Sequence, residues 1–517
     1  MRARLKAVDR KWWTLFAMCF ALFMIMLDNT IVNIALPSIQ RDLKASSANL
    51  QWTIDAYILT FAALILLGGK LGDRFGRKRM FIVGLVIFTL SSMLCALSTS
   101  DSELIAARAL QGVGGALLNP LSLSIIASTF PRKQLPTAIG IWAGVSGVGL
   151  SVGPLVGGVL VEQASWSAVF WVNVPIGVVA VLVTLWAVKE SRDPTTRRLD
   201  LPGTGLITVG LAAVVWALIK SGTHGWGSVY TLGFLAAGAA LLAAFIWWER
   251  RSSDPMLPLS FFRKRAFSVA SAVVLLVGFG MFGVIFFITL YFQNVQGYSP
   301  LQAGVRSLPM TMMLMAVAPL AGKINARIGP RLQLTVGMLL SSAGLFGLSR
   351  IGVHSSYNAI WPFYSLMGAG LAFAMPAVSA TGMAVVDPRK AGIASGVINA
   401  SRQVGGALGI AVMGSLGAAL TRSRWADDLA ALPDATQTKL AGSRDLVLGG
   451  QGDVIGRIAG GPAAKAAALD AFMHGVTGAL IAGGALMLLA AVVAYVGLWG
   501  FRMPVQPEGT APAVVEA

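Results

Sequence analysis

Long apolar runs alternate with short polar connections from one end of the chain to the other. A helix that spans the hydrocarbon core of a bilayer needs about 20 mostly apolar residues, and by that measure the sequence predicts about fourteen spans. They lie near residues 12–36, 51–69, 79–98, 103–129, 138–161, 168–188, 201–220, 228–248, 266–291, 302–322, 332–350, 357–382, 391–419 and 472–501. The pattern therefore predicts an all-α membrane protein with both termini on one side of the bilayer.

The composition agrees with a membrane protein, because 56% of the 517 residues are hydrophobic and only 12% are charged. A water-soluble domain devotes about a quarter of its residues to charge. The net charge of +18 could indicate a nucleic-acid partner, but the basic residues recur in short clusters between the apolar runs. A nucleic-acid-binding protein concentrates them on one face or arm. We therefore expect a lipid bilayer and no nucleic acid as the chain's surroundings.

The N-terminal segment resembles a signal peptide, since it is basic and then apolar. Its apolar run is longer than the about 7–15 residues of a signal peptide, contains Asp28 and leads into further spans. We therefore expect it to be kept as the first helix. The two cysteines, Cys19 and Cys95, lie inside apolar runs, so neither a disulfide framework nor a thiolate metal site is expected.

The basic residues fix the expected orientation, because cytoplasmic loops carry an excess of lysine and arginine. Alternate connections hold basic clusters: Arg2 to Lys11, Lys70 to Arg79, Arg132 and Lys133, Lys189 to Arg198, Arg250 to Arg265, Lys323 to Arg331, and Arg389 and Lys390. The other short loops carry only Arg41, Lys44, Lys220 and Arg350. Both termini are therefore expected in the cytoplasm, with the chain in the cytoplasmic (inner) membrane.

A weak internal repeat suggests two halves. G-K-L-G-D-R-F-G-R-K at 69–78 follows the second span, and G-K-I-N-A-R-I-G-P-R at 322–331 follows the tenth. Parallel repeats of this kind are typical of duplicated transporter folds. The expected organisation is a six-helix bundle over 1–190, a two-helix linker insertion over 191–250, a second six-helix bundle over 251–503 and a disordered tail over 504–517. The second bundle would carry a long external loop over 420–471, whose Ala-rich part near 462–471 could form a short interfacial helix.

Charged residues within spans are the strongest functional candidates, because each costs roughly 2.5–3.5 kcal/mol at mid-helix on insertion scales. Asp28, Asp55 and Arg108 lie at comparable depths in the outer halves of three spans of the first half. Low dielectric favours a neutral carboxylate, whereas a nearby arginine favours the ionised form. We interpret Asp28 as the preferred proton carrier. A fixed ion pair that locks three helices is the alternative, and Asp55 could simply be solvated near the interface.

A polar cavity is the second expectation. Arg402 lies near mid-depth in the thirteenth span and would face either a polar cavity or a carbonyl-rich helix interface, two readings that the sequence leaves equal. The candidate cavity residues are Asn33, Trp52, Tyr57, Gln111 and Arg402. Met312, Met313 and Met315 could also line it, although methionines at this spacing are more often packing residues.

The fifth span is rich in glycine. Gly149, Gly153 and Gly157 are four residues apart, so they share one face and allow a partner helix to approach closely. Pro154 removes a backbone donor and can kink the helix, and Gly158 extends the series. The series fits either ordinary tight packing or a seam that moves during function, and the spacing does not separate the two.

Several kinds of chemistry have no support in the sequence. It contains no phosphate-binding loop, no cluster of zinc ligands and no Ser/His/Asp arrangement. We therefore expect no enzyme activity, no cofactor and no ATP-driven transport. An ion gradient is the natural energy source for such a chain.

Six motifs together resemble the fourteen-span drug:proton antiporters of the major facilitator superfamily. They are L-D-N-T-I-V-N-I-A-L-P at 27–37, I-D-A-Y at 54–57, G-K-L-G-D-R-F-G-R-K at 69–78, R-A-L-Q-G-V-G-G-A at 108–116, the glycine series from Gly140 to Gly158 with Pro154, and W-S-A-V-F-W-V-N-V-P-I-G at 166–177. Ser167 stands where an arginine is common in the family. The resemblance covers residues 12 to 501.

The resemblance implies a function and roles for residues. It implies a major facilitator fold and a monomeric, proton-driven exporter of small amphiphilic molecules such as drugs, with Arg108 involved in proton transfer. The loop formed by Gly69, Asp73, Arg74, Gly76 and Arg77 would be a cytoplasmic latch between the halves. Members that export dications carry acidic residues in the thirteenth helix, but this chain has Arg402 there. Monocations, neutral amphiphiles or anions are therefore the expected substrates.

Two alternatives keep the same fold. One is a proton-coupled uptake symporter, against which the antiporter-like glycine series speaks. The other is a translocase for a lipid or cell-envelope precursor, for which drugs would be incidental substrates.

Overall fold

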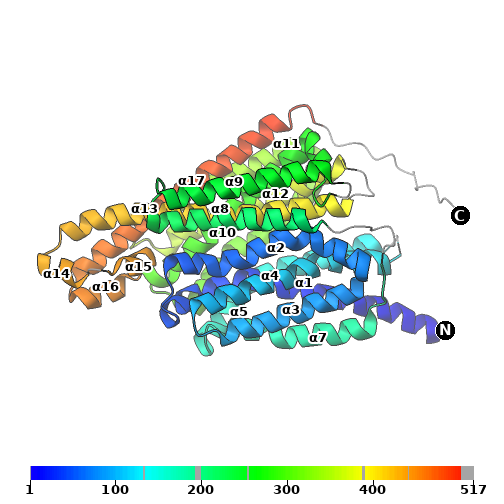
Figure 1. Ribbon diagram of the computed structural model, residues 1–517, viewed down its shortest axis with the longest axis horizontal. Coiled ribbons are helices and arrows are strands. Elements are labelled where there is room, and N and C mark those ends of the chain that lie inside the picture. Colours follow the sequence, from blue (N-terminus) through cyan, green and yellow to red (C-terminus); the bar gives the residue numbers. More distant parts are fainter. Residues whose placement is uncertain are drawn as a thin grey trace.

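The computed structural model of the protein describes residues 2–131, 134–192, 200–252, 255–386, 391–440 and 442–501, and these residues form helices and connections without a β-strand (Figure 1). Twelve of the described helices are long and apolar enough to cross a membrane. The predicted all-α membrane fold is confirmed, while the count of fourteen spans stays a prediction. The tail over 504–517 lies outside the described residues.

The first part of the chain contains seven helices. They are α1 (Arg2–Asp42), α2 (Ser47–Phe75), α3 (Arg77–Leu97), α4 (Asp101–Thr129), α5 (Leu135–Gln163), α6 (Ala168–Trp171) and α7 (Asn173–Ala187). Among the closest packing partners are α1 with α5, α2 with α4, and α3 with both α4 and α7. The predicted sixth span thus consists of two helices, α6 and α7, that meet at Val172.

The rest of the chain begins with a helical hairpin, α8 (Leu201–His224) and α9 (Val229–Arg251). It continues with η1 (Leu259–Arg263), α10 (Arg265–Leu290), the π-helical turn η2 (Tyr291–Val295), α11 (Pro300–Leu348), α12 (Tyr357–Ala384), α13 (Ala391–Ala430), α14 (Asp434–Lys439), α15 (Arg444–Leu448), α16 (Gly452–Ala459) and α17 (Pro462–Gly497). Helix α10 packs on α13, α11 packs on α12 and α17, and α8 contacts both α2 and α13.

Serine side chains begin several helices. Ser46, Ser100, Ser228 and Ser299 each stand just before a helix and accept a hydrogen bond from a backbone N–H three residues on. Such an N-cap side chain satisfies a donor that the helix itself leaves unpaired. These serine N-caps let the chain turn between long helices within a few residues.

The two copies of the sequence repeat have the same backbone turn. Gly76, at the eighth position of the first copy, has φ 109° and separates α2 from α3. Gly329, at the eighth position of the second copy, has φ 77° and breaks α11 into two helical parts. A side chain is strained at such φ values, so glycine is needed at both turns. The break at Gly329 lies between the predicted tenth and eleventh spans.

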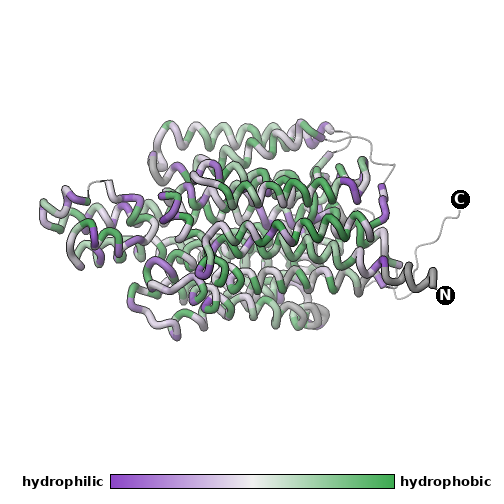
Figure 2. The backbone as a smooth tube through the Cα atoms, turned by 90° about the horizontal axis from the view of Figure 1, so that it is seen from below, coloured by the Kyte–Doolittle hydropathy of each residue, from purple (hydrophilic) through white to green (hydrophobic). Residues whose placement is uncertain are grey.

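Polar residues gather at the two ends of the helix bundle, and apolar residues dominate its middle (Figure 2). Helix α1 begins and α17 ends at one end of the molecule (Figure 1). The opposite end carries a small folded unit over residues 420–471, here called the cap, which contains α14, α15 and α16 and the adjoining ends of α13 and α17. The cap has its own apolar cluster, which includes Trp425, Val447 and Ile455.

The structure corrects one local prediction. Residues 462–471 are not a separate interfacial helix, because α17 runs without a break from Pro462 to Gly497. Ala464 and Ala468 are buried against the cap cluster, and the residues after them pack in the main bundle. The Ala-rich stretch thus joins the cap rigidly to the last long helix.

Candidate functional site

A buried ion pair joins α1 to α4 in the middle of the described bundle. Arg108 Nη1 lies 2.6 Å from Asp28 Oδ2, and the two side chains are 2% and 0% exposed. Gln111, one helical turn after Arg108, donates from Nε2 to Asp28 Oδ1 at 3.0 Å and accepts at Oε1 from Arg108 Nη1 at 2.7 Å. The helical spacing thus aims both side chains of α4 at one carboxylate.

A fourth residue completes the hydrogen bonds to Asp28, and sequence reasoning missed it. Asn173, at the start of α7, donates from Nδ2 to Asp28 Oδ1 at 3.2 Å and to Ser92 Oγ of α3 at 3.0 Å. Asn173 is fully buried. The available signal was a lone amide in the otherwise apolar run W-S-A-V-F-W-V-N-V-P. We call Asp28, Arg108, Gln111 and Asn173 the carboxylate network.

Arg108 also holds α2. Its Nε donates to the backbone carbonyl of Thr53 at 3.1 Å, and its guanidinium carbon lies 4.3 Å from the centre of the Tyr57 ring. The Phe170 ring of α6 lies on another side at 5.8 Å. A planar guanidinium can stack on aromatic faces while its edge donates hydrogen bonds. One arginine therefore ties together α1, α2, α4 and α6.

The two charges of the carboxylate network depend on each other. Three side chains donate hydrogen bonds to the Asp28 carboxylate, and Arg108 also supplies its counter-charge. A proton on Asp28 would remove the counter-charge of Arg108 and replace an acceptor by a donor. Because an unpaired buried charge is costly, the helices around the pair would then favour a different arrangement.

Asp55 is buried but lies outside the carboxylate network. Its side chain is 0% exposed, and neither carboxylate oxygen has a hydrogen-bond partner among the described residues. The alternative that Asp55 is solvated near the interface is wrong for this structure. Asp55 lies one helical turn after Gln51, whose side chain faces Gly414 of α13. It therefore lies on the side of α2 that faces α13.

The glycine series of α5 packs closely against α1. A Cβ atom at Gly153 would lie 1.8 Å from Thr30 Oγ1, and one at Gly149 or Gly157 would lie within 2.9 Å of a side-chain atom of α1. Pro154 and Gly158 point elsewhere, toward α11: a Cβ at Gly158 would lie 2.6 Å from Leu301 Cα. The series thus serves two helix contacts at once, and its role as a moving seam stays a prediction.

The expected latch residues form a compact turn. Asp73 pairs with Arg77 at 2.7 Å, and the Arg77 N–H donates to the carbonyl of Ser191. Gly76 lies against Glu190, whose carboxylate caps the start of α3. Arg74 lies over the neighbouring Phe75 ring, and Gly69 faces Pro120 of α4.

One residue of this turn reaches past the first seven helices. Lys70 donates to the carbonyl of Pro255, which lies between α9 and η1. Among the described residues Asp73 bonds only within its own half, while residues 387–390 before α13 are outside the description. The latch between halves therefore stays a prediction.

No group of three His, Cys, Asp or Glu side chains in the described ranges could hold a metal ion. The carboxylate network itself contains one acid and three groups that donate to it. The negative charge of Asp28 is therefore balanced within the protein by Arg108.

Comparison with known proteins decides the family. The family model described as Major Facilitator Superfamily matches residues 18–410, which include all of the carboxylate network. The chain belongs to the major facilitator superfamily. The resemblance inferred from the sequence motifs is thereby confirmed.

Curated relatives within the superfamily are similar over most of their length. The chain is 37% identical to the tetracenomycin C resistance and export protein of Streptomyces glaucescens, over 97% of this chain and 94% of that one. It is 38% identical to the multidrug resistance protein Stp of Mycobacterium tuberculosis, over 82% and 79% of the two chains. It is 38% identical to the puromycin resistance protein pur8 of Streptomyces alboniger, over 81% and 84%.

Solved structures agree on the fold. A bacterial homolog of the human lysosomal transporter Spinster, in an inward-facing and unoccupied conformation, matches with a TM-score of 0.66 at 18% identity, over 94% of this chain and 97% of that one. An auto-inhibited peptide transporter of the POT family matches with a TM-score of 0.65 at 15% identity, over 97% and 99%. At these identities the likeness concerns the major facilitator fold alone.

The predicted cavity residues of this facilitator fall in different places. Tyr57 and Gln111 surround Arg108 in and beside the carboxylate network. Trp52 packs against Trp216 of α8, with ring centres 5.5 Å apart and the rings tilted by 49°. Asn33 is buried within α1 and donates to the Asn29 carbonyl.

Arg402 lies apart from these residues, on α13. Its Nη2 donates to Asn399 Oδ1 at 2.9 Å, and Asn399 Nδ2 lies 3.5 Å from Asn119 Oδ1 of α4. Arg402 and the two asparagines thus form a polar group where α4 meets α13. Among the described residues no hydrogen bond or ion pair joins this group to the carboxylate network, so a single cavity that includes all five candidates stays a prediction.

Proposed function

We propose that the chain is a proton-coupled antiporter that exports small amphiphilic molecules, such as drugs, antibiotics and toxic metabolites, across the cytoplasmic membrane by alternating access. The observation that carries the proposal is the fully buried Asp28–Arg108 pair, tied to Gln111 and Asn173. The names of the similar proteins, which describe resistance to or export of antibiotics, support the exporter part.

The proposed architecture has two six-helix bundles, over 1–190 and 251–503, with α8 and α9 inserted between them over 191–250. Both termini lie in the cytoplasm, and the cap faces the outside. The basic clusters near the ends of α1, α3, α9 and α10 support this orientation. The protein acts as a monomer, without a cofactor, and a proton gradient drives it.

In the proposed cycle, the proton and the substrate use the two faces in turn. With substrate bound from the inside, the halves rock to the outward-facing state and release it. A proton from outside then neutralises Asp28, which weakens the links from α1 to α4 and α7. The carrier returns inward, and Asp28 releases its proton to the cytoplasm as the Arg108 contact re-forms.

The substrate class follows from the charges of the second half. Helix α13 carries Arg402 within its apolar part, together with Asn399 and Gln403, and no acidic residue between 391 and 426. A dication would meet a positive charge there, because the two carboxylates of α13, Asp427 and Asp428, lie at its far end in the cap. We therefore propose neutral amphiphiles, monocations or anions as substrates.

Asp28→Asn tests the proton coupling, with Asp42→Asn as the matched control. Asp42 lies exposed at the end of the same helix, outside the network. In inside-out vesicles with an imposed pH gradient, Asp28→Asn should lose gradient-driven ethidium transport by about a hundredfold, the loss of an essential proton carrier. Asp42→Asn should transport as the wild type does.

The direction of proton flux separates antiport from uptake. Substrate added to proteoliposomes should move protons opposite to itself in the wild type and move none in Asp28→Asn. Undiminished gradient-driven transport by Asp28→Asn would remove Asp28 as the carrier, and co-directional proton flux would overturn antiport.

A further inference from the structure

Two seams join the proposed halves, and they differ in the structure. One is formed by α5 and α11, and the other by α2 and α13. At the cap end the α5–α11 seam is closed: a Cβ at Gly304 would lie 2.2 Å from the Pro154 carbonyl oxygen. Glu162 of α5 accepts hydrogen bonds there from the Ser299 hydroxyl at 2.6 Å and the Leu301 N–H at 3.0 Å.

Further from the cap, the same faces of α5 and α11 are exposed. Met315 lies eleven residues after Gly304, within about 20° of its direction at 100° per residue, yet it is 46% exposed. Gly144 lies fourteen residues before Gly158, within about 40° of its direction. A Cβ at Gly144 would have no atom within 4 Å. The two helices therefore diverge toward the end of the bundle opposite the cap.

The α2–α13 seam stays closed along its length. A Cβ at Gly414, near the cap, would lie 2.3 Å from Gln51 Nε2. A Cβ at Gly396, near the other end of α13, would lie 2.7 Å from Leu66 of α2. Fifteen residues of α2 separate Gln51 from Leu66, about 22 Å of helix. This seam has no opening comparable to that between α5 and α11.

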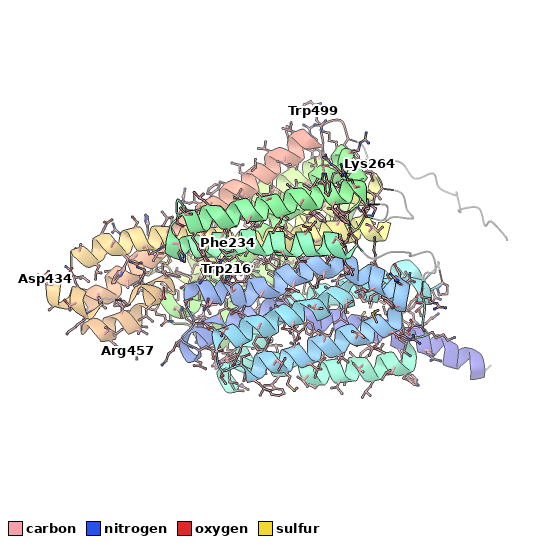
Figure 3. All side chains as sticks on the ribbon, viewed as in Figure 1. Trp216, Phe234, Lys264, Asp434, Arg457 and Trp499 are labelled. Atoms are coloured by element: carbon pink, nitrogen blue, oxygen red, sulfur yellow. The ribbon has the colours of Figure 1, made fainter. Side chains whose placement is uncertain are left out.

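The hairpin of α8 and α9 covers the closed seam. Helix α8 contacts both α2 and α13, and its Trp216 packs against Trp52 of α2. Helix α9 packs on α8, where Phe234 lies beside Trp216 with ring centres 6.5 Å apart (Figure 3). Only 17% of the most apolar window of α9 is buried, so α9 presents its outer face to lipid. Two layers of helix thus separate the α2–α13 seam from the bilayer.

We propose that substrates enter this transporter sideways from the inner leaflet, between the diverging halves of α5 and α11, while the α8–α9 hairpin closes the matching route between α2 and α13. This inference rests on the proposed function and names its access route. Exposed side chains near the opening are apolar and uncharged: Ile141 and Val148 of α5, and Met312 and Met315 of α11. Such a surface suits molecules with an apolar body that partition into lipid, and methionine adapts to varied shapes.

The first test fills the opening. Gly144→Trp places an indole where the glycine faces open space, and Gly233→Trp on α9 is the matched control, because a Cβ there also meets nothing within 4 Å. In inside-out vesicles, the rate of ethidium or Nile red transport by Gly144→Trp should fall about tenfold, which corresponds to about 1.4 kcal/mol. Gly233→Trp should transport at the wild-type rate.

The second test does not depend on a variant that blocks transport. Met315→Cys and, as control, Ile246→Cys on α9 have similarly exposed positions, 46% and 43%, and the native cysteines are buried. A lipid-soluble maleimide should label both variants. Saturating ethidium should slow labelling of Met315→Cys about tenfold and leave Ile246→Cys unchanged, since only the former lies on the route.

The outcomes separate the two proposals. If wild-type vesicles transport neither dye, the proposed export function fails. If they do transport the dyes, two results would each overturn the α5–α11 route. One is wild-type transport by a folded Gly144→Trp variant, and the other is labelling of Met315→Cys that ethidium does not slow.

Discussion

At the scale of single residues, the carboxylate network explains how a charge is kept inside an apolar bundle. Asp28 accepts from three donors on three side chains, and Arg108 also contacts Gln111 Oε1, the Thr53 carbonyl and the Tyr57 and Phe170 rings. A buried charge pair adds little net stability, but loss of one partner leaves an uncompensated charge. The network therefore depends on both charges being present.

We predict that Arg108→Gln is less stable than Asp28→Asn/Arg108→Gln. The single change should lower the free energy of unfolding by about 3–5 kcal/mol, because the buried Asp28 carboxyl group then loses its counter-charge. The double change removes both charges and should recover most of that loss, although transport should stay absent. Thermal unfolding of the detergent-solubilised variants measures the difference. Equal stability of the two variants would contradict the electrostatic account.

Gly153 gives a second prediction at this scale. Alanine there would bring Cβ within 1.8 Å of Thr30 Oγ1, so α1 and α5 must separate or Thr30 must change rotamer. We expect Gly153→Ala to lose about 1–3 kcal/mol of stability, as other overpacked positions do. Gly144→Ala is the control, since its Cβ meets nothing within 4 Å and helix propensity favours alanine by about 1 kcal/mol. Thermal unfolding of both variants decides, and a Gly153→Ala variant as stable as the wild type would refute close packing.

The sequence identified the charges of the network but not all of its partners. Asp28 and Arg108 stood out because ionised groups are rare within spans. Asn173 did not, because a single amide costs far less to bury and its direction depends on how α7 rotates against α1 and α3. The burial of Asp55 was also beyond the sequence, since it depends on α13 lying along that side of α2.

At the scale of elements, apolar length predicted the helices well and their ends less well. Hydrogen bonding continues a helix into polar residues, so α1 extends from Arg2 to Asp42, well past the apolar run 12–36. The predicted start of the last span at 472 has no helix-breaking residue near it. The helix is interrupted instead at Gly460 and Gly461, and α17 begins at the next residue, Pro462.

The cap is an element with its own core, and this predicts local unfolding. Trp425 is 5% exposed in the cap cluster, which is separate from the cluster of the main bundle. Trp425→Ala should lower the free energy of unfolding of the cap by about 3–5 kcal/mol, as other buried Trp→Ala changes do. Protease added to intact cells should then cut the variant within 430–462 while the long helices stay protected. A variant that resists cleavage as well as the wild type does would show that the cap needs no core of its own.

At the scale of the whole molecule, the start of α1 and the end of α17 lie at the end of the helix bundle opposite the cap (Figure 1). Ala435 is exposed in the cap, and Arg250 is exposed at the far end of α9. We predict that a membrane-impermeant maleimide labels Ala435→Cys in intact cells and Arg250→Cys only after permeabilisation, because basic clusters stay in the cytoplasm. The buried native cysteines give a low background. The reverse labelling pattern would invert the proposed orientation and, with it, the direction of export.

Because α13 and α17 continue unbroken into the cap, the cap is rigidly attached to the second half and moves with it. The cap also contacts other parts of the bundle: Asn294 donates to the Gly449 carbonyl, and Gly449 lies against Gln40 of α1. A small rotation of those two helices would be magnified at the tip near Asp434, which projects furthest from the bundle (Figure 3). A fluorescent dye attached there would move with each transport cycle, and its movement would be recorded from outside the cell.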